Sequence, residues 1–103
     1  MRKIRNITPG DILLEEFLKP LGITAYRLAK STRMPQTRIS QILQNKRKIS
    51  ADTALRLSKF FGNTPNFWLG IQNDYDLEEE RKHLYKILTG IPTFNHDLSF
   101  AVK

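Results

Sequence analysis

The side chains best suited to chemistry lie close together, in the stretch RMPQTRISQILQNKRKIS at positions 33–50. Its first half carries amides, hydroxyls and guanidinium groups, and its second half carries three consecutive cations, Lys46, Arg47 and Lys48. Amide and guanidinium groups match the base edges of a duplex, and lysine and arginine bind phosphate oxygens. This combination indicates a surface that contacts a double-stranded nucleic acid.

Two short helices would present these groups. Thr24 suits the N-cap of a helix that ends near Thr32, and Pro35 suits the first turn of a second helix that runs to Leu43. Two helices of this length, joined by a three-residue break, have the dimensions of a helix-turn-helix at 24–43. Their predicted buried residues are Ala29, Met34, Ile39 and Ile42.

Burial of those four residues leaves a polar outer face on the second helix. A major groove about 12 Å wide admits one helix, and glutamine pairs there with adenine. The residues that we predict to read bases are Gln36, Thr37, Arg38, Ser40 and Gln41. Arg38 suits a guanine or a phosphate equally well. The residues that we predict to bind phosphate are Arg27, Arg33, Gln44, Asn45, Lys46, Arg47 and Lys48.

The charge distribution also favours an anionic partner. The 103 residues carry a formal net charge of +7. Residues 24–59 hold nine cations and one anion, a net charge of +8, whereas the rest of the chain sums to −1. A positive excess confined to one third of a chain is typical of proteins that bind polyanions. A basic face that is merely solvated is the alternative interpretation.

Helical periodicity predicts an all-α fold. Five helical patterns begin near positions 9, 24, 35, 50 and 64, and the fifth continues as an amphipathic C-terminal extension. We predict a first helix at 9–19 that is closed by Pro20 and Gly22. We expect a DNA-binding domain at 1–73, and at 74–103 a C-terminal helix and tail available for a dimer or partner contact. The residues after Gly90 have no clear period, so we expect a loosely ordered tail.

The aromatic cluster in the fifth pattern allows two interpretations. A domain this small needs its large aromatic residues in the core, yet tryptophan and phenylalanine also anchor interfaces. The predicted dimer interface consists of Phe67, Trp68 and Ile71. A two-fold axis there would set the two recognition helices about 34 Å apart, facing successive major grooves of a palindromic operator.

Other classes of function have little support. The chain has no cysteine, phosphate-binding loop or nucleophile elbow, and the single Glu80/His83 pair is too few ligands for a metal. We therefore expect no catalytic residue, no metal and no cofactor. No apolar stretch approaches the roughly 20 residues that cross a bilayer, so we expect a cytoplasmic protein without a membrane contact.

Two segments carry a family resemblance over about residues 8–78. TPGDILLEEFLKPLGITAYRLAK and PQTRISQILQNKRKISADTALRLSKFFGNTPNFWLGIQNDYDLE resemble the HigA-family (VapI-type) addiction-module antitoxins, which are lambda-repressor-like, Xre-type DNA-binding proteins. The resemblance implies a five-helix lambda-repressor-like fold, a homodimer, repression of its own operon, and neutralisation of a small basic toxin similar to HigB or RelE mRNA endoribonucleases. It implies base contacts at Gln36, Thr37, Arg38 and Gln41.

One departure and two rival functions accompany the resemblance. Relatives usually carry glycine in the turn where this chain has Arg33, and a non-glycine residue at positive φ costs about 1 kcal/mol or more. Either the turn differs locally or the chain tolerates the strain. The rival functions are a stand-alone Xre-type repressor without a toxin and a protein-interaction adaptor whose basic face serves solubility.

Overall fold

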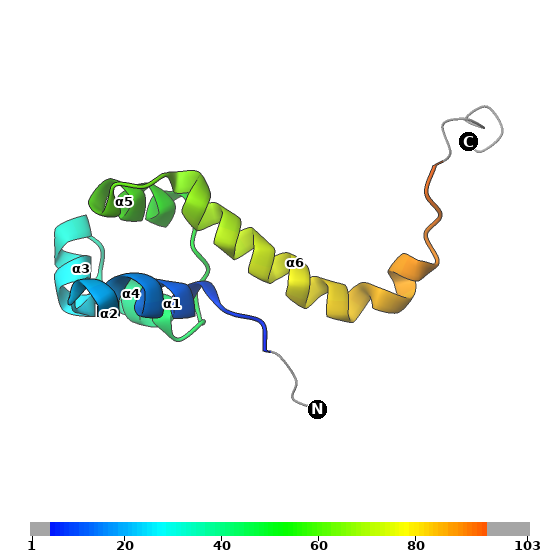
Figure 1. The fold of residues 1–103 in the computed structure, drawn as a ribbon, viewed down its shortest axis with the longest axis horizontal. Coiled ribbons are helices and arrows are strands. Elements are labelled where there is room, and N and C mark those ends of the chain that lie inside the picture. Colours follow the sequence, from blue (N-terminus) through cyan, green and yellow to red (C-terminus); the bar gives the residue numbers. More distant parts are fainter. Residues whose placement is uncertain (1–4, 95–103) are drawn as a thin grey trace.

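The computed structural model describes residues 5–94, and this part of the chain is helical without strands (Figure 1). The elements in chain order are α1 (Pro9–Ile12), the π-helical segment η1 (Leu13–Leu18), α2 (Lys19–Leu21), α3 (Ala25–Thr32), α4 (Gln36–Leu43), α5 (Ala51–Phe61) and α6 (Pro65–Thr89). Because α1, η1 and α2 follow one another without a break, they form one continuous helix. The prediction of an all-α fold with five helices is confirmed.

The helix starts follow the capping residues of the sequence. The hydroxyl oxygen of Thr24 accepts a hydrogen bond from the Arg27 N–H at 3.0 Å. Ser50 begins α5 and Thr64 begins α6 in the same way. Each cap satisfies a backbone donor that has no partner inside its helix.

The first helix ends later than the predicted boundary at Lys19. It continues to Leu21 and stops at Gly22, whose φ of 65° is left-handed. Pro20 lies inside the final turn, and its ring occupies the space that an α-helix gives to the carbonyl of Glu16. The turns before it are accordingly π-helical, and the Lys19 N–H donates to the carbonyl of Leu14, five residues back.

The core lies between the short helices and the start of α6. Its fully or nearly fully buried apolar residues are Leu13, Leu18, Leu28, Ala29, Met34, Ile39, Ile42, Ile49, Ala54, Leu57 and Trp68. All four residues predicted to fasten the helix pair are among them, so that prediction is confirmed. α1 approaches α4 so closely that a Cβ on Gly10 would collide with the carbonyl oxygen of Ile42.

The aromatic cluster corrects part of the predicted dimer interface. Trp68 is 0% exposed, and its indole N–H donates to Asn63 Oδ1 at 2.9 Å. The Phe17 ring centroid lies 4.8 Å from that of Trp68. The prediction that Trp68 contacts a second copy is wrong, because its side chain is enclosed within its own protomer. Phe67 is 39% exposed and Ile71 is partly exposed, so their role in a dimer stays a prediction.

Helix α6 extends well beyond the other helices (Figure 1). Its first turns pack against α5, and its distal part carries exposed apolar side chains such as Leu77, Tyr85 and Ile87. The predicted boundary between residues 73 and 74 falls inside α6, and this division of the chain stays a prediction. The predicted tail lies mostly outside the described residues, which end at 94. No helix in the described part is long and apolar enough to cross a membrane.

Candidate nucleic-acid interface

Helices α3 and α4 pack against each other through a tight turn. The Met34 N–H donates to the carbonyl of Ala29 at 2.9 Å, and the Arg33 N–H donates to that of Lys30 at 3.2 Å. Ala29 is 3% exposed and Met34 is 5% exposed. A small residue at the crossing and an apolar residue in the turn therefore fix the angle at which α4 leaves the body of the protein.

The outer face of α4 collects the predicted base-reading residues. Gln36, Thr37 and Gln41 are exposed, and Ser40 is partly exposed. Their amide and hydroxyl groups offer donors and acceptors along one side of an eight-residue helix. The sequence prediction placed these groups together, and the structure places them on one surface. Their contact with bases stays a prediction.

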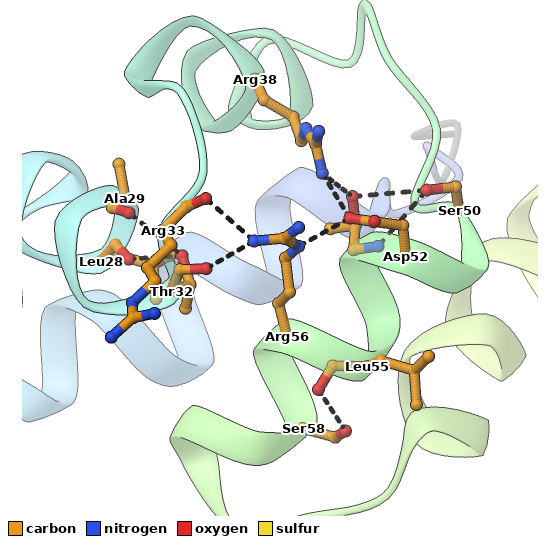
Figure 2. A network of polar contacts seen from close by, with 11 residues as sticks. Leu28, Ala29, Thr32, Arg33, Arg38, Ser50, Asp52, Leu55, Arg56 and Ser58 are labelled. Atoms are coloured by element: carbon orange, nitrogen blue, oxygen red, sulfur yellow. Dashed lines mark hydrogen bonds and ion pairs between the residues drawn. The ribbon is translucent and has the colours of Figure 1, made fainter.

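Arg38 differs from its neighbours because its guanidinium is already paired. Nη1 lies 2.7 Å from Asp52 Oδ1, and the side chain of Arg38 is only 23% exposed. Figure 2 shows the guanidinium directed at Asp52 at the start of α5. A base or phosphate contact would use the other guanidinium nitrogens or replace this ion pair, since both hydrogen bonds that the side chain makes to α5 use Nη1. Its predicted role in base reading is not tested by this geometry.

Asp52 joins three helices through two arginines (Figure 2). Its Oδ1 also accepts from Arg56 Nε at 2.7 Å. Arg56 Nη1 in turn donates to the carbonyls of Thr32 at 3.0 Å and Arg33 at 2.9 Å. The guanidinium of Arg56, and after it that of Arg38, holds the pKa of Asp52 below its usual value of 3.8. This network fixes the turn and α4 to α5.

Arg33 keeps the left-handed backbone that the turn requires, with a φ of 58°. Its N–H closes the last turn of α3, and its carbonyl accepts from Arg56. The turn therefore retains the conformation that suits glycine, and the network around Arg56 holds it there despite the side chain. Of the two possibilities left open by the sequence, tolerated strain is the one found.

The loop after α4 forms the basic edge of this surface. All seven residues predicted to bind phosphate are exposed. Arg47 Nε donates to Gln41 Oε1 at 2.9 Å, which connects the loop to the polar face of α4. Lys48 Nζ lies 3.3 Å from Asp76 Oδ2 on α6, and 74% of its side chain is still exposed. The arrangement offers hydrogen-bonding groups beside a row of cations, as a duplex requires.

The sequence prediction missed the residues that support this surface. Asp52 and Arg56 stand at i, i+4 spacing, which already indicates a pair on one helix face. Gln72, Tyr75 and Asp76 stand at i, i+3 and i+4 spacing on α6 and contact the loop. Their spacing places them on one helix face, but the sequence does not show that this face contacts the loop, which lies more than 20 residues earlier.

Comparisons with known proteins agree with this geometry. The helix-turn-helix family model matches residues 14–68. Virulence-associated protein I of Dichelobacter nodosus is 44% identical over 89 residues, which cover 84% of this chain and 82% of that protein. A solved HigA-family addiction module antidote protein of Coxiella burnetii is 44% identical, with a TM-score of 0.80 over 87% of this chain and 98% of the other. Pseudomonas aeruginosa antitoxin HigA, solved with the higBA promoter, is 31% identical, with a TM-score of 0.79 over 86% and 97%.

Proposed function

The chain belongs to the helix-turn-helix family that contains the HigA antitoxins, and from this premise we propose that it is a DNA-binding antitoxin. It binds the operator of its own operon through α4 and the loop that follows, and it neutralises a small basic toxin. We propose a binding protein without catalytic activity of its own, which acts in the cytoplasm.

One observation carries the DNA-binding half of the proposal. The exposed polar face of α4 adjoins the exposed cations at 46–48 in the loop that follows it, within a fold that matches a HigA antitoxin solved with the higBA promoter. Side chains on the helix read bases, and the loop supplies contacts to phosphate that are independent of sequence. Gln36, Thr37, Ser40 and Gln41 are the proposed base readers.

We propose that the DNA-bound form is a homodimer. A helix this short contacts only a few base pairs, and two copies about 34 Å apart would cover successive major grooves. Phe67 and Ile71 remain candidates for the dimer contact, as does the exposed apolar part of α6. Support for the dimer comes from the resemblance to HigA-family antitoxins, which implies a homodimer, and a two-fold axis would suit a palindromic operator.

A nuclease-protection experiment on the gene's own upstream region tests the operator. We expect a protected stretch that spans about two helical turns, as two-fold related recognition helices in successive major grooves require. A protected stretch of only about one helical turn would show that a single copy binds. Uniform protection at high protein concentration alone would contradict an operator in this region.

Co-expression tests the toxin half. The open reading frame beside this gene is expressed with and without this protein, and growth is followed. Arrest by the neighbouring product alone, relieved by co-expression, supports an antitoxin. A neighbour that has no effect on growth favours a stand-alone repressor. Loss of relief in a chain that still binds its operator would separate toxin neutralisation from DNA binding.

A further inference from the structure

The loop at 44–50 carries the three exposed cations but has no regular secondary structure. If the loop were flexible, DNA binding would have to order it, and the lost backbone entropy would cost about 1–2 kcal/mol of free energy per residue. The loop is nevertheless held at three points by one helix that lies outside the helix pair. That helix is α6, and the contacts come from Gln72, Tyr75 and Asp76.

Gln72 makes the most buried of these contacts. Its Oε1 accepts a hydrogen bond from the Ile49 N–H at 2.9 Å, and its Nε2 donates to Asp76 Oδ1 at 3.0 Å. Ile49 is 3% exposed and Gln72 is 6% exposed. Since an ionised carboxylate only accepts hydrogen bonds, Asp76 holds the amide nitrogen and leaves Oε1 for the Ile49 N–H. The end of the loop is thereby fixed to α6.

Tyr75 and Asp76 contact the loop closer to its cations. Asn45 has a φ of 59°, and its Nδ2 donates to the Tyr75 hydroxyl at 2.9 Å. Asp76 Oδ2 lies 3.3 Å from Lys48 Nζ, whose side chain is 74% exposed. The backbone at the start of the loop is also held by α4, since the Asn45 and Lys46 N–H groups donate to the carbonyls of Ile42 at 3.0 Å and Gln41 at 2.7 Å. The Tyr75 contact therefore fixes the Asn45 side chain, and the Asp76 contact directs the last cation. The ammonium group of Lys48 still faces solvent.

The three residues of α6 share one face because they are spaced by three and four positions. They hold the loop near its start and near its end, on either side of Lys46 and Arg47. We propose that Gln72, Tyr75 and Asp76 are positioning residues for DNA binding, which keep the loop in the conformation that contacts the phosphate backbone. This inference rests on the proposed function, and it gives α6 a share in DNA affinity without a DNA contact.

The substitutions Tyr75→Phe and Gln72→Met test the inference. Each removes the group that holds the loop and keeps a side chain of similar size. Affinity is measured by fluorescence anisotropy on the upstream duplex and on a scrambled duplex at several salt concentrations. We expect each variant to lose the same factor on both duplexes, roughly threefold to tenfold for one hydrogen bond. The slope of log affinity against log salt should become less steep, since fewer phosphates are neutralised together.

Two further variants separate positioning from a general effect on folding. Tyr85→Phe makes the same change farther along α6, where the side chain is 68% exposed, and it should bind like the wild type. Asn45→Gly removes the partner of Tyr75 and suits the positive φ. The double variant Asn45→Gly/Tyr75→Phe should bind no more weakly than the weaker of the two single variants, because both remove one contact.

Amide hydrogen exchange provides a readout without DNA. The Ile49 N–H should exchange faster in Gln72→Met than in the wild type, while core amides such as that of Leu57 keep their rates. The inference would be overturned if Tyr75→Phe and Gln72→Met bound both duplexes like the wild type. A loss of affinity for the upstream duplex alone would overturn it as well. Failure of the proposed function is a different result, in which the wild type itself shows no salt-dependent binding to either duplex.

Discussion

At the residue scale, we expect side chains of α4 to determine which DNA sequence is bound, and the cations of the loop at 44–50 to bind phosphate in any sequence. Gln36 is exposed at the start of α4, and Lys46 is exposed in the loop. We expect Gln36→Ala to weaken binding to the operator by about 1–3 kcal/mol and to leave binding to random DNA nearly unchanged. Titration of both duplexes measures the difference. Equal loss on both would remove Gln36 from the base-reading residues.

Lys46→Ala removes a cation of the loop and is compared with Gln36→Ala. We expect it to weaken all duplexes alike and to lower the salt slope by about one, because one phosphate contact is lost. The same titrations, repeated over a range of salt concentrations, give the slope. A loss restricted to the operator would instead place Lys46 among the residues that read bases.

The turn residue Arg33 stores backbone strain. Its φ of 58° suits glycine. Arg33 takes part in its hydrogen bonds with the Arg56 side chain and with α3 through its own carbonyl and N–H alone. We expect Arg33→Gly to raise the free energy of unfolding, by up to about 1 kcal/mol, because relief of strain exceeds the added entropy of the unfolded chain. Urea unfolding measures this change. A less stable variant would show that the Arg33 side chain itself stabilises the turn.

The sequence predicted which residues of α3 and α4 are buried, but it did not predict the ion pair that Arg38 makes. Ala29, Met34 and Ile39 were predictable because helical spacing assigns each position to a face. The pair of Arg38 with Asp52 joins residues 14 positions apart on different helices, and only the packing of α4 on α5 brings them together. Arg38 was therefore predicted to contact DNA alone, because the sequence does not show that its side chain also contacts α5.

At the element scale, α1 depends on a close approach to α4. A Cβ at Gly10 would collide with the backbone of Ile42, which cannot move without displacing α4. We expect Gly10→Ala to lower the free energy of unfolding by about 1–3 kcal/mol, as overpacking does. Gly70→Ala is the control, because a Cβ there meets nothing within 4 Å and alanine favours a helix. Equal stability of the two variants would contradict this account of the contact.

The Asp52 network should make the packing of α3, α4 and α5 sensitive to acid. Because the arginines lower the pKa of Asp52 below 3.8 in the folded protein, their contribution is present above that value and is lost as the pH falls through the lower folded pKa. We expect Asp52→Asn to be less stable than the wild type at about pH 6 and to approach it as the pH falls below 3.8 and through the lower folded pKa. Urea unfolding at several pH values checks this. Parallel curves would exclude a role of the Asp52 charge.

Element boundaries were predictable where a residue has one clear local role. Thr24, Ser50 and Gly62 begin or end their helices as capping chemistry predicts. The π-helical turns and the later end at Leu21 were not predictable, because they depend on how the first helix accommodates Pro20 within its last turn. Local signals therefore predicted the helices and their order but not the π-helical turns of the first one.

At the scale of the whole molecule, α6 connects the core, the loop after α4 and an exposed distal part. Trp68 at its start completes the core, and Gln72 and Tyr75 hold the loop. The sequence predicted the helix from its amphipathic pattern. It did not show that one turn of α6 lies beneath the loop, since that follows only from the path of the chain between α4 and α6.

The most direct test of the account is a fluorescence-anisotropy titration with a duplex from the gene's own upstream region, beside a scrambled duplex, at two salt concentrations. We predict salt-dependent binding to both duplexes and a preference for the upstream duplex of about a thousandfold or more, as specific sites usually show. Equal affinity for the two duplexes would contradict sequence reading by α4 at this operator, and absence of binding to either would contradict the central claim.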